Sequence, residues 1–207
     1  IPAVIQQSIP AVSTTFLTAL VSTYSVTAIA AYGVTGKLET ILFYPAMALN
    51  MVLTTIIGQC AGGKRYDRAK DYLKCALGYG CVLLVILSAA VVGFSQQLSG
   101  LFVKSSDVAV IVGTYFLIVS IGYILNTVTN CYLGTLNGMG SPSKSMFLMI
   151  FYYIIVRMPL AYLLSYLGFG LNGIWVAVLI SHIIASIAAI FTGAIYMKKN
   201  EVSVKAI

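Results

Sequence analysis

Six long apolar runs dominate the chain and constrain its fold more than any other feature of the sequence. A helix needs about 20 mainly apolar residues to cross the hydrocarbon core of a bilayer, and runs of that length recur from end to end. They are too long and continuous for the short alternating strands of a membrane barrel. We therefore predict six membrane-spanning helices, at about residues 3–21, 29–58, 72–94, 108–134, 146–167 and 171–197.

Charged residues are too few to cover a globular surface in water. They make up 8% of the chain, against 60% hydrophobic residues, whereas a soluble domain carries about 25% charged residues. Membrane lipid is therefore the main solvent, and we expect an all-α integral membrane protein in which residues 1–207 form one six-helix lobe. The chain begins Ile1-Pro2 with neither an initiator Met nor a signal-peptide pattern, so we expect further spans to precede it.

Lysine and arginine gather on one side of the predicted topology. When the loops alternate between the two sides, one side holds nine basic residues and the other holds only Lys104. The positive-inside rule places the basic side in the cytoplasm, so we predict a multi-pass protein of the cell membrane with both ends cytoplasmic. The net charge of +7 reflects this bias, and no nucleic acid partner is expected. The nine residues are Lys64, Arg65, Arg68, Lys70, Lys74, Lys144, Lys198, Lys199 and Lys205.

Three charged residues fall inside apolar segments: Lys37, Glu39 and Arg157. A charge at bilayer depth costs at least about 2.5–3.5 kcal/mol, so such residues usually face a cavity or a partner. At 1.5 Å rise per residue, Glu39 and Arg157 lie roughly 18 and 15 Å from the outer ends of their spans. Our hypothesis is that Glu39 lines a cavity with Arg157 or Lys37 as its counter-charge. The alternative is that Lys37 and Glu39 lie at the outer interface and extend toward water.

Polar and helix-bending residues mark further candidate positions. Asn126 and Asn130 are four residues apart and so share one helix face. They line a cavity or, equally in keeping with the pattern, hydrogen-bond to a neighbouring helix. Pro45 and Pro159 lie inside spans, where proline commonly kinks the helix axis. Kinked spans are usual in transporters, although many structural membrane helices also contain proline.

Motifs for catalysis and for metal binding are missing from the sequence. It has no G-x-S-x-G, H-E-x-x-H or Walker pattern and a single histidine, His182. The four cysteines form neither a C-x-x-C pair nor a cluster with histidine, so no metal site is indicated. The glycines of residues 168–173 match G-x-G-x-x-G but are better explained as a turn between two spans. We therefore expect neither an enzyme nor a cofactor.

Several ordered stretches resemble the multidrug and toxic compound extrusion family, and in particular its C-terminal six-helix lobe. The most specific is the loop that contains Gly58, Gln59 and Arg68, which is similar to a G-Q-x-x-G-A-G-x-x-x-R-A pattern. Gly63 departs slightly from that pattern. The matches follow in order over nearly the whole chain, at residues 28–33, 58–70, 134–140, 157–162 and 170–175.

The resemblance implies twelve helices in two six-helix lobes, with a cavity between the lobes and exchange of organic cations or drugs for Na⁺ or H⁺. The N-terminal six-helix lobe would then be a missing partner. Family members carry acidic residues on helices seven and ten, whereas this chain has Gln6 and Gln7 in the first and no acid in the second. Coupling would therefore fall to Glu39 or, as we favour, to acids in the other lobe. Alternatives are a flippase for lipid-linked precursors, disfavoured by the few basic residues in the spans, and a non-transporting fragment.

Overall fold

The computed structural model describes residues 2–205, and these residues are helical almost throughout, without a strand. The predicted all-α class is therefore confirmed. In chain order the elements are α1 (Pro2–Ser22), α2 (Val26–Gly62), α3 (Tyr66–Gly93), α4 (Ser95–Gly100), α5 (Ser106–Gly138), α6 (Pro142–Ile150), η1 (Phe151–Arg157), α7 (Met158–Leu164), η2 (Ser165–Phe169) and α8 (Gly170–Lys205), where η denotes a π-helical segment.

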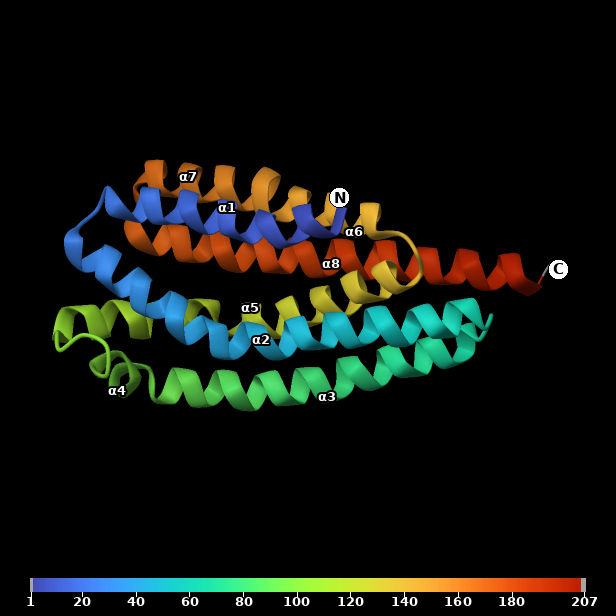
Figure 1. The fold of residues 1–207 in the computed structure, drawn as a ribbon. Helices are drawn as coiled ribbons and strands as arrows, with labels where there is room; N and C mark the ends of the chain where they lie inside the picture. Colours follow the sequence, from blue (N-terminus) through green and yellow to red (C-terminus); the bar gives the residue numbers. More distant parts are fainter. Residues whose placement is uncertain (1, 206–207) are drawn as a thin grey trace.

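Five helical stretches are long and apolar enough to cross a membrane, where the sequence predicted six spans. The difference lies in the last stretch, residues 142–200, which contains two arms of opposite direction. The chain reverses at Gly168 and Gly170, whose φ angles of 89° and 58° are rarely adopted by other residues. The arm α6–η1–α7–η2 and the arm α8 therefore run antiparallel to each other (Figure 1).

The junction between α2 and α3 is shorter than the sequence predicted. A loop over residues 59–71 was expected, but α2 continues to Gly62 and α3 begins at Tyr66. Polar residues continue a helix as readily as apolar ones once it leaves the hydrocarbon, so the apolar run ends before the helix does. The turn from α1 into α2 is fixed by Ser25, whose side chain accepts the backbone N–H of Ala28 at 3.0 Å.

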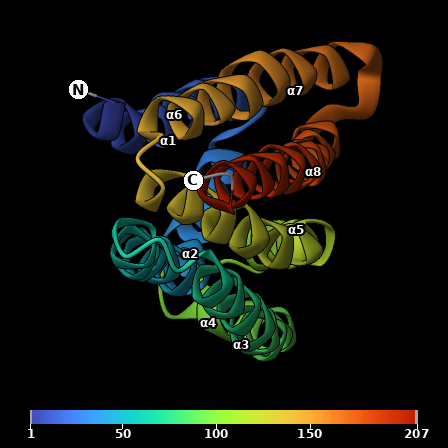
Figure 2. The ribbon, with the colours of Figure 1, turned by 90° about the vertical axis from the view of Figure 1, so that its right-hand side faces the viewer.

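Helix α5 lies at the centre of the bundle and contacts α2, α3, α4, α6 and α8. Figure 2 shows the layers end-on: α1, α6 and α7 lie on one side, α3 and α4 on the other, and α2, α5 and α8 between them. The approach of α5 to α2 depends on Gly134 and Gly138. An added Cβ at Gly134 would lie 2.4 Å from the Asn50 carbonyl oxygen, and one at Gly138 would lie 2.8 Å from that of Thr54.

The distribution of side chains is inverted relative to a soluble protein. Large apolar side chains such as Leu117 (69% exposed) and Ile121 (62% exposed) cover the outside of the helices. Polar side chains such as Asn126, Thr127 and Ser181 are buried between them. A bundle of this kind is stable only with apolar solvent around it. The surface therefore matches the integral membrane protein predicted from the composition.

Candidate functional site

A cavity of about 550 Å³ lies between α1, η1 and α8 on one side and α2 and α5 on the other. Its walls combine carboxamides, tyrosines and apolar groups with the ionisable side chains of Glu39, Arg157 and His182. The lining residues are Gln6, Gln7, Pro10, Thr14, Leu17, Tyr32, Glu39, Phe43, Met47, Asn50, Met51, Thr54, Thr55, Tyr115, Asn126, Asn130, Asn137, Met149, Tyr152, Tyr153, Arg157, Val178 and His182.

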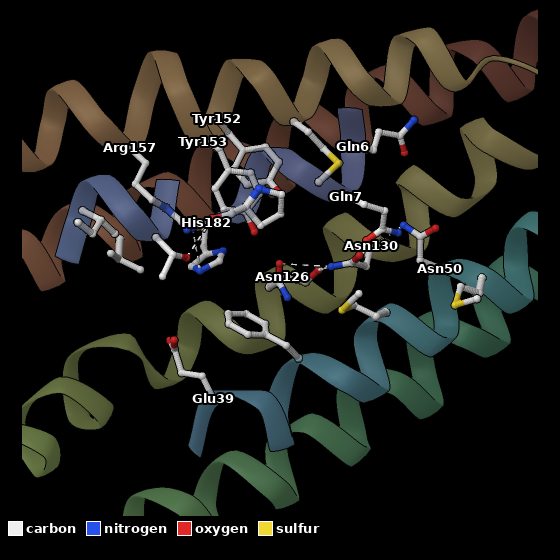
Figure 3. Close-up of a pocket in the computed structure, with 18 of the residues that line it drawn as sticks. Gln6, Gln7, Glu39, Asn50, Asn126, Asn130, Tyr152, Tyr153, Arg157 and His182 are labelled. Carbon is white, nitrogen blue, oxygen red and sulfur yellow. Dashed lines mark hydrogen bonds between the residues drawn. The ribbon is translucent and has the colours of Figure 1, made fainter. Parts of the chain in front are cut away.

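Carboxamide side chains line the end of the cavity where α1, α2 and α5 meet (Figure 3). Asn50 donates to Asn130 Oδ1 at 3.4 Å, and Asn130 donates in turn to the backbone oxygen of Asn126 at 3.0 Å. Gln6 and Asn137 face each other, with Asn137 Nδ2 donating to Gln6 Oε1 at 3.2 Å. Asn126 and Asn130 of α5 therefore line the cavity, and Asn130 also hydrogen-bonds to a neighbouring helix, so both predicted uses of this pair are found.

Glu39 lies on α2 at the opposite end of the cavity and is half-buried. The hydroxyl of Tyr123 donates to its Oε1 at 2.8 Å, and the hydroxyl of Tyr115 donates to the same oxygen. Among the described residues, no hydrogen bond engages Oε2. Tyr115 is itself fixed by edge-on contact with Trp175, whose ring centre lies 4.7 Å away. The carboxyl group is therefore held in place through one oxygen, and the other stays available to a ligand.

Arg157 ends η1 and is only 6% exposed. Its Nε donates to Ser181 Oγ at 2.7 Å, and its Nη2 donates to His182 Nε2 at 3.1 Å. The guanidinium carbon lies 4.5 Å from the centre of the Tyr153 ring, a cation–π geometry. The contacts of Arg157 with Ser181 and His182 join the arm that contains η1 to α8, next to the cavity.

The predicted counter-charge for Glu39 is not found at bonding distance. Among the described residues, Glu39 forms no ion pair with Arg157 or Lys37. Glu39 is hydrogen-bonded to two tyrosine hydroxyls, and Arg157 to Ser181 and His182. Lys37 is exposed and is not among the residues that line the cavity. Glu39 and Arg157 do lie at the same end of the cavity, on different elements (Figure 3). Their functional roles remain predictions.

The two prolines differ in their surroundings. Pro159 is the second residue of α7, two positions after the end of η1, and it lacks the N–H that would bond back into η1. A π-helical segment before it satisfies the backbone differently, and such segments often occur at functional sites. It carries Tyr152, Tyr153 and Arg157, all of which line the cavity. Pro45 lies inside α2, between cavity residues on either side of it.

The loop motif residues lie away from the cavity. Gly58 contacts the end of α5, where an added Cβ would lie 3.5 Å from the carbonyl oxygen of Gly138. The Gln59 carbonyl oxygen accepts the N–H of Gly63 at 3.0 Å, which closes α2. Arg68 is exposed in the first turn of α3. These residues shape the junction of α2 and α3.

Sequence reasoning did not single out Asn50 or Tyr115, which line the cavity, and did not identify Tyr123 as a partner of Glu39. Tyr115 and Tyr123 are eight residues apart, a spacing that repeats one helix face. That spacing could have indicated that the two tyrosines face the same neighbouring helix. Nothing in the sequence connects them to Glu39, because the rotation of α2 and α5 about their own axes is set by packing.

The chain matches one protein family over most of its length. The MatE family model matches residues 2–163, most of the chain. The chain belongs to the MatE family. This confirms the resemblance drawn from the ordered motifs, and because MatE proteins are transporters it also confirms that the chain is not an enzyme.

This MatE chain is similar to two curated relatives of different description. It is 30% identical over 153 residues to a probable multidrug resistance protein NorM of Pasteurella multocida, an alignment that covers 72% of this chain and 33% of that protein. It is 27% identical over 155 residues to a FAD transporter of Shewanella oneidensis, covering 75% and 34%. The aligned region thus spans about a third of the length of the curated relatives.

Solved structures of MATE transporters share the fold of this MatE chain. An outward-facing multidrug resistance MATE family transporter superimposes with a TM-score of 0.91 at 17% identity, covering 97% of this chain and 45% of the other. The Vibrio cholerae MATE transporter VcmN in its bent form gives 0.89 at 20% identity, covering 97% and 46%. This MatE chain therefore corresponds in fold to just under half of each of those proteins.

Proposed function

We propose that the chain is one six-helix lobe of a two-lobe secondary active exporter, and that a second lobe closes its cavity. The proposal is supported by the near-complete coverage of this chain by transporter structures that are about twice as long. The cavity lies between helices of this lobe, and a facing lobe would complete its enclosure. Alternating access follows when two rigid lobes rock about a shared central site.

The cavity favours organic cations or drugs that carry a positive group beside aromatic rings. Tyr32, Phe43, Tyr115, Tyr152 and Tyr153 line it, and a ring face attracts a desolvated cation by up to about 2 kcal/mol. Such contacts are weakly directional, so they accept substrates of varied shape. The carboxamides add hydrogen-bond donors and acceptors that adapt to either kind of partner.

Glu39 is the residue on which coupling to Na⁺ or H⁺ depends in this lobe. Its carboxylate holds one oxygen toward two tyrosine hydroxyls and leaves the other without a hydrogen bond among the described residues. A Na⁺ ion or proton bound to this oxygen competes with the positive group of the substrate. The protein therefore carries either the ion or the substrate at one time, as exchange requires. The single observation that carries the proposal is this half-buried carboxylate on the wall of a polar and aromatic cavity.

Two alternatives fit the cavity less well. A flippase for lipid-linked precursors needs several basic groups for a pyrophosphate, and Arg157 is the one lysine or arginine among the described residues that line the cavity. A non-transporting fragment would have no use for a half-buried carboxylate facing an open volume. Both alternatives predict that no ion gradient drives dye movement through the protein.

The test is transport by the full-length protein in proteoliposomes with cytoplasmic ends inside. We expect an imposed Na⁺ or pH gradient to drive movement of a fluorescent organic cation, and the gradient that works identifies the coupling ion. Glu39→Gln should weaken the gradient dependence. Asp107→Asn is the matched control, because it removes the same charge from an exposed position at the start of α5. Equal gradient-driven transport by the wild type and Glu39→Gln would overturn the role of Glu39 in coupling. Absence of gradient-driven transport by the wild type would overturn the proposal that the protein is an exporter.

A further inference from the structure

Arg157 is a buried cation without a carboxylate partner among the described residues. Its hydrogen bonds go to the hydroxyl of Ser181 and the imidazole of His182, and its guanidinium carbon lies over the ring of Tyr153. None of these groups carries a neutralising negative charge. Because a buried guanidinium is usually paired with an acid, the positive charge beside this cavity is unbalanced by its own contacts.

His182 adds an unpartnered donor at the same place. An arginine N–H can only donate, so His182 Nε2 accepts and the neutral ring carries its proton on Nδ1. That Nδ1 is buried and has no hydrogen-bond partner. The ring is also held firmly, because Gly122 leaves just enough room for it: a Cβ there would lie 3.0 Å from His182 Cδ2. Two donors, one of them charged, therefore lie side by side without an acceptor of negative charge.

Glu39 does not supply the missing charge by direct contact. Its Oε1 is occupied by the two tyrosine hydroxyls of α5, and it lies on α2, across the cavity from η1. The two opposite charges thus stand apart at one end of the same cavity, with room between them for a ligand. This separation suits a molecule that carries both signs of charge.

We propose that Arg157, with His182 and Ser181 beside it, is a binding subsite for the carboxylate of a zwitterionic organic substrate. The positive group of the same substrate then lies toward Glu39 and the aromatic rings. This inference rests on the proposed export function, which it narrows from organic cations in general to those that also bear an anionic group. Free guanidinium N–H groups bind a carboxylate with charge-assisted hydrogen bonds, which are the strongest of their kind.

The experiment compares two forms of one dye: a rhodamine with a free carboxylate, and the methyl ester of that rhodamine, which is a simple cation. Binding to the purified full-length protein is followed by fluorescence polarisation, in a maltoside detergent free of phospholipid and again in phospholipid nanodiscs. We expect the wild type to bind the acid about tenfold or more tightly than the ester, as loss of a charge-assisted hydrogen bond predicts.

Variants locate the preference within the protein. Arg157→Gln should remove it by weakening binding of the acid about tenfold while binding of the ester changes by less than about threefold. Arg157→Lys keeps the positive charge and should retain part of the preference for the acid over the ester. Lys104→Met is the control, since it removes one positive charge from an exposed loop residue. Should Arg157→Gln fail to fold, His182→Phe serves instead, and it should lower the preference while leaving binding of the ester intact.

Each outcome bears on the proposal. Equal binding of acid and ester by the wild type would overturn it, as would a loss of both dyes in a folded Arg157→Gln protein. A preference present in detergent but absent in nanodiscs would mean that a lipid phosphate fills the subsite, and would overturn the assignment to substrate. Failure of the wild type to bind either dye would instead count against the proposed export function.

Discussion

The contact between α2 and α5 gives the sharpest stability prediction, at Gly134. Its substitution by alanine would place Cβ at 2.4 Å from the carbonyl oxygen of Asn50 and 2.9 Å from the Asn50 Cα. Ordinary contact begins near 3.4 Å, so the helices must separate by about 1 Å there, because backbone atoms cannot rotate away. The hydrogen bond from Asn50 to Asn130, already 3.4 Å long, would break.

The expected loss of stability follows from these distances. Overpacking costs about 1–3 kcal/mol, while alanine gains up to about 1 kcal/mol over glycine in helix propensity. Gly113 offers a matched control on the same helix, since its added Cβ would meet nothing closer than 3.7 Å. Gly134→Ala should therefore be about 1–3 kcal/mol less stable than Gly113→Ala, because both variants share the gain in propensity.

Thermal unfolding of the two purified variants in one detergent measures this difference. For a protein of this size about 1 kcal/mol moves Tm by roughly 2–4 °C, so Gly134→Ala should melt roughly 2–12 °C below Gly113→Ala. The Gly134 variant should also lose affinity for a cationic dye, because the carboxamide end of the cavity is disturbed. Equal melting temperatures would refute the close approach of α2 and α5 as the reason for this glycine.

Three further predictions concern the cavity and the turn between the last two arms. Tyr123→Phe removes one donor that stabilises the free carboxylate of Glu39, so Glu39 should hold a coupling ion more tightly and the ion concentration for half-maximal exchange should fall about tenfold. An unchanged value in the proteoliposome assay would separate the tyrosine from coupling. Pro159→Ala restores a backbone N–H and should let η1 relax toward an α-helix. Arg157 should then change its orientation, so that dye affinity falls while Tm stays the same or rises. Unchanged dye affinity would argue against a role of Pro159 in positioning Arg157. Gly170→Ala forces alanine into a φ of 58° and a ψ of −145° and should destabilise the protein by about 1–3 kcal/mol in thermal unfolding, and a Tm equal to that of the wild type would show that the turn tolerates a side chain.

The path of the chain was largely predictable from hydropathy because lipid exposure demands long apolar helices. Each predicted run lies within a helical arm of the structure, except that the run 72–94 extends one residue past the end of α3 at Gly93. Hydropathy did not predict the helical segments that lie outside the hydrocarbon core, or the contacts between side chains inside the bundle. The helices extend past the apolar runs, which shortened the expected loop over residues 59–71, and the short helix α4 has no apolar run of its own.

The cavity was only half predictable, and Glu39 shows why. Its depth in the second span could be estimated from the rise per residue, and so could that of Arg157. The estimate placed both at one level, and the structure has them at one end of one cavity. Their bonding partners depend on the rotation of each helix about its axis, which packing decides. Tyr115 and Tyr123 from α5 thus took the place expected for a basic residue.

The central claim is that this lobe forms one wall of a water-accessible cavity that binds substrate. Cysteine accessibility tests this claim most directly. In a full-length protein whose own cysteines are replaced by serine or alanine, Asn130→Cys places a thiol in the cavity, and Ile121→Cys places one on the outer face of the same helix. We predict that a charged, water-soluble thiol reagent labels the Asn130→Cys protein, that bound dye slows this labelling, and that Ile121→Cys reacts far more slowly. Labelling at Ile121→Cys but not at Asn130→Cys, or labelling of Asn130→Cys that saturating dye leaves unchanged, would contradict the account.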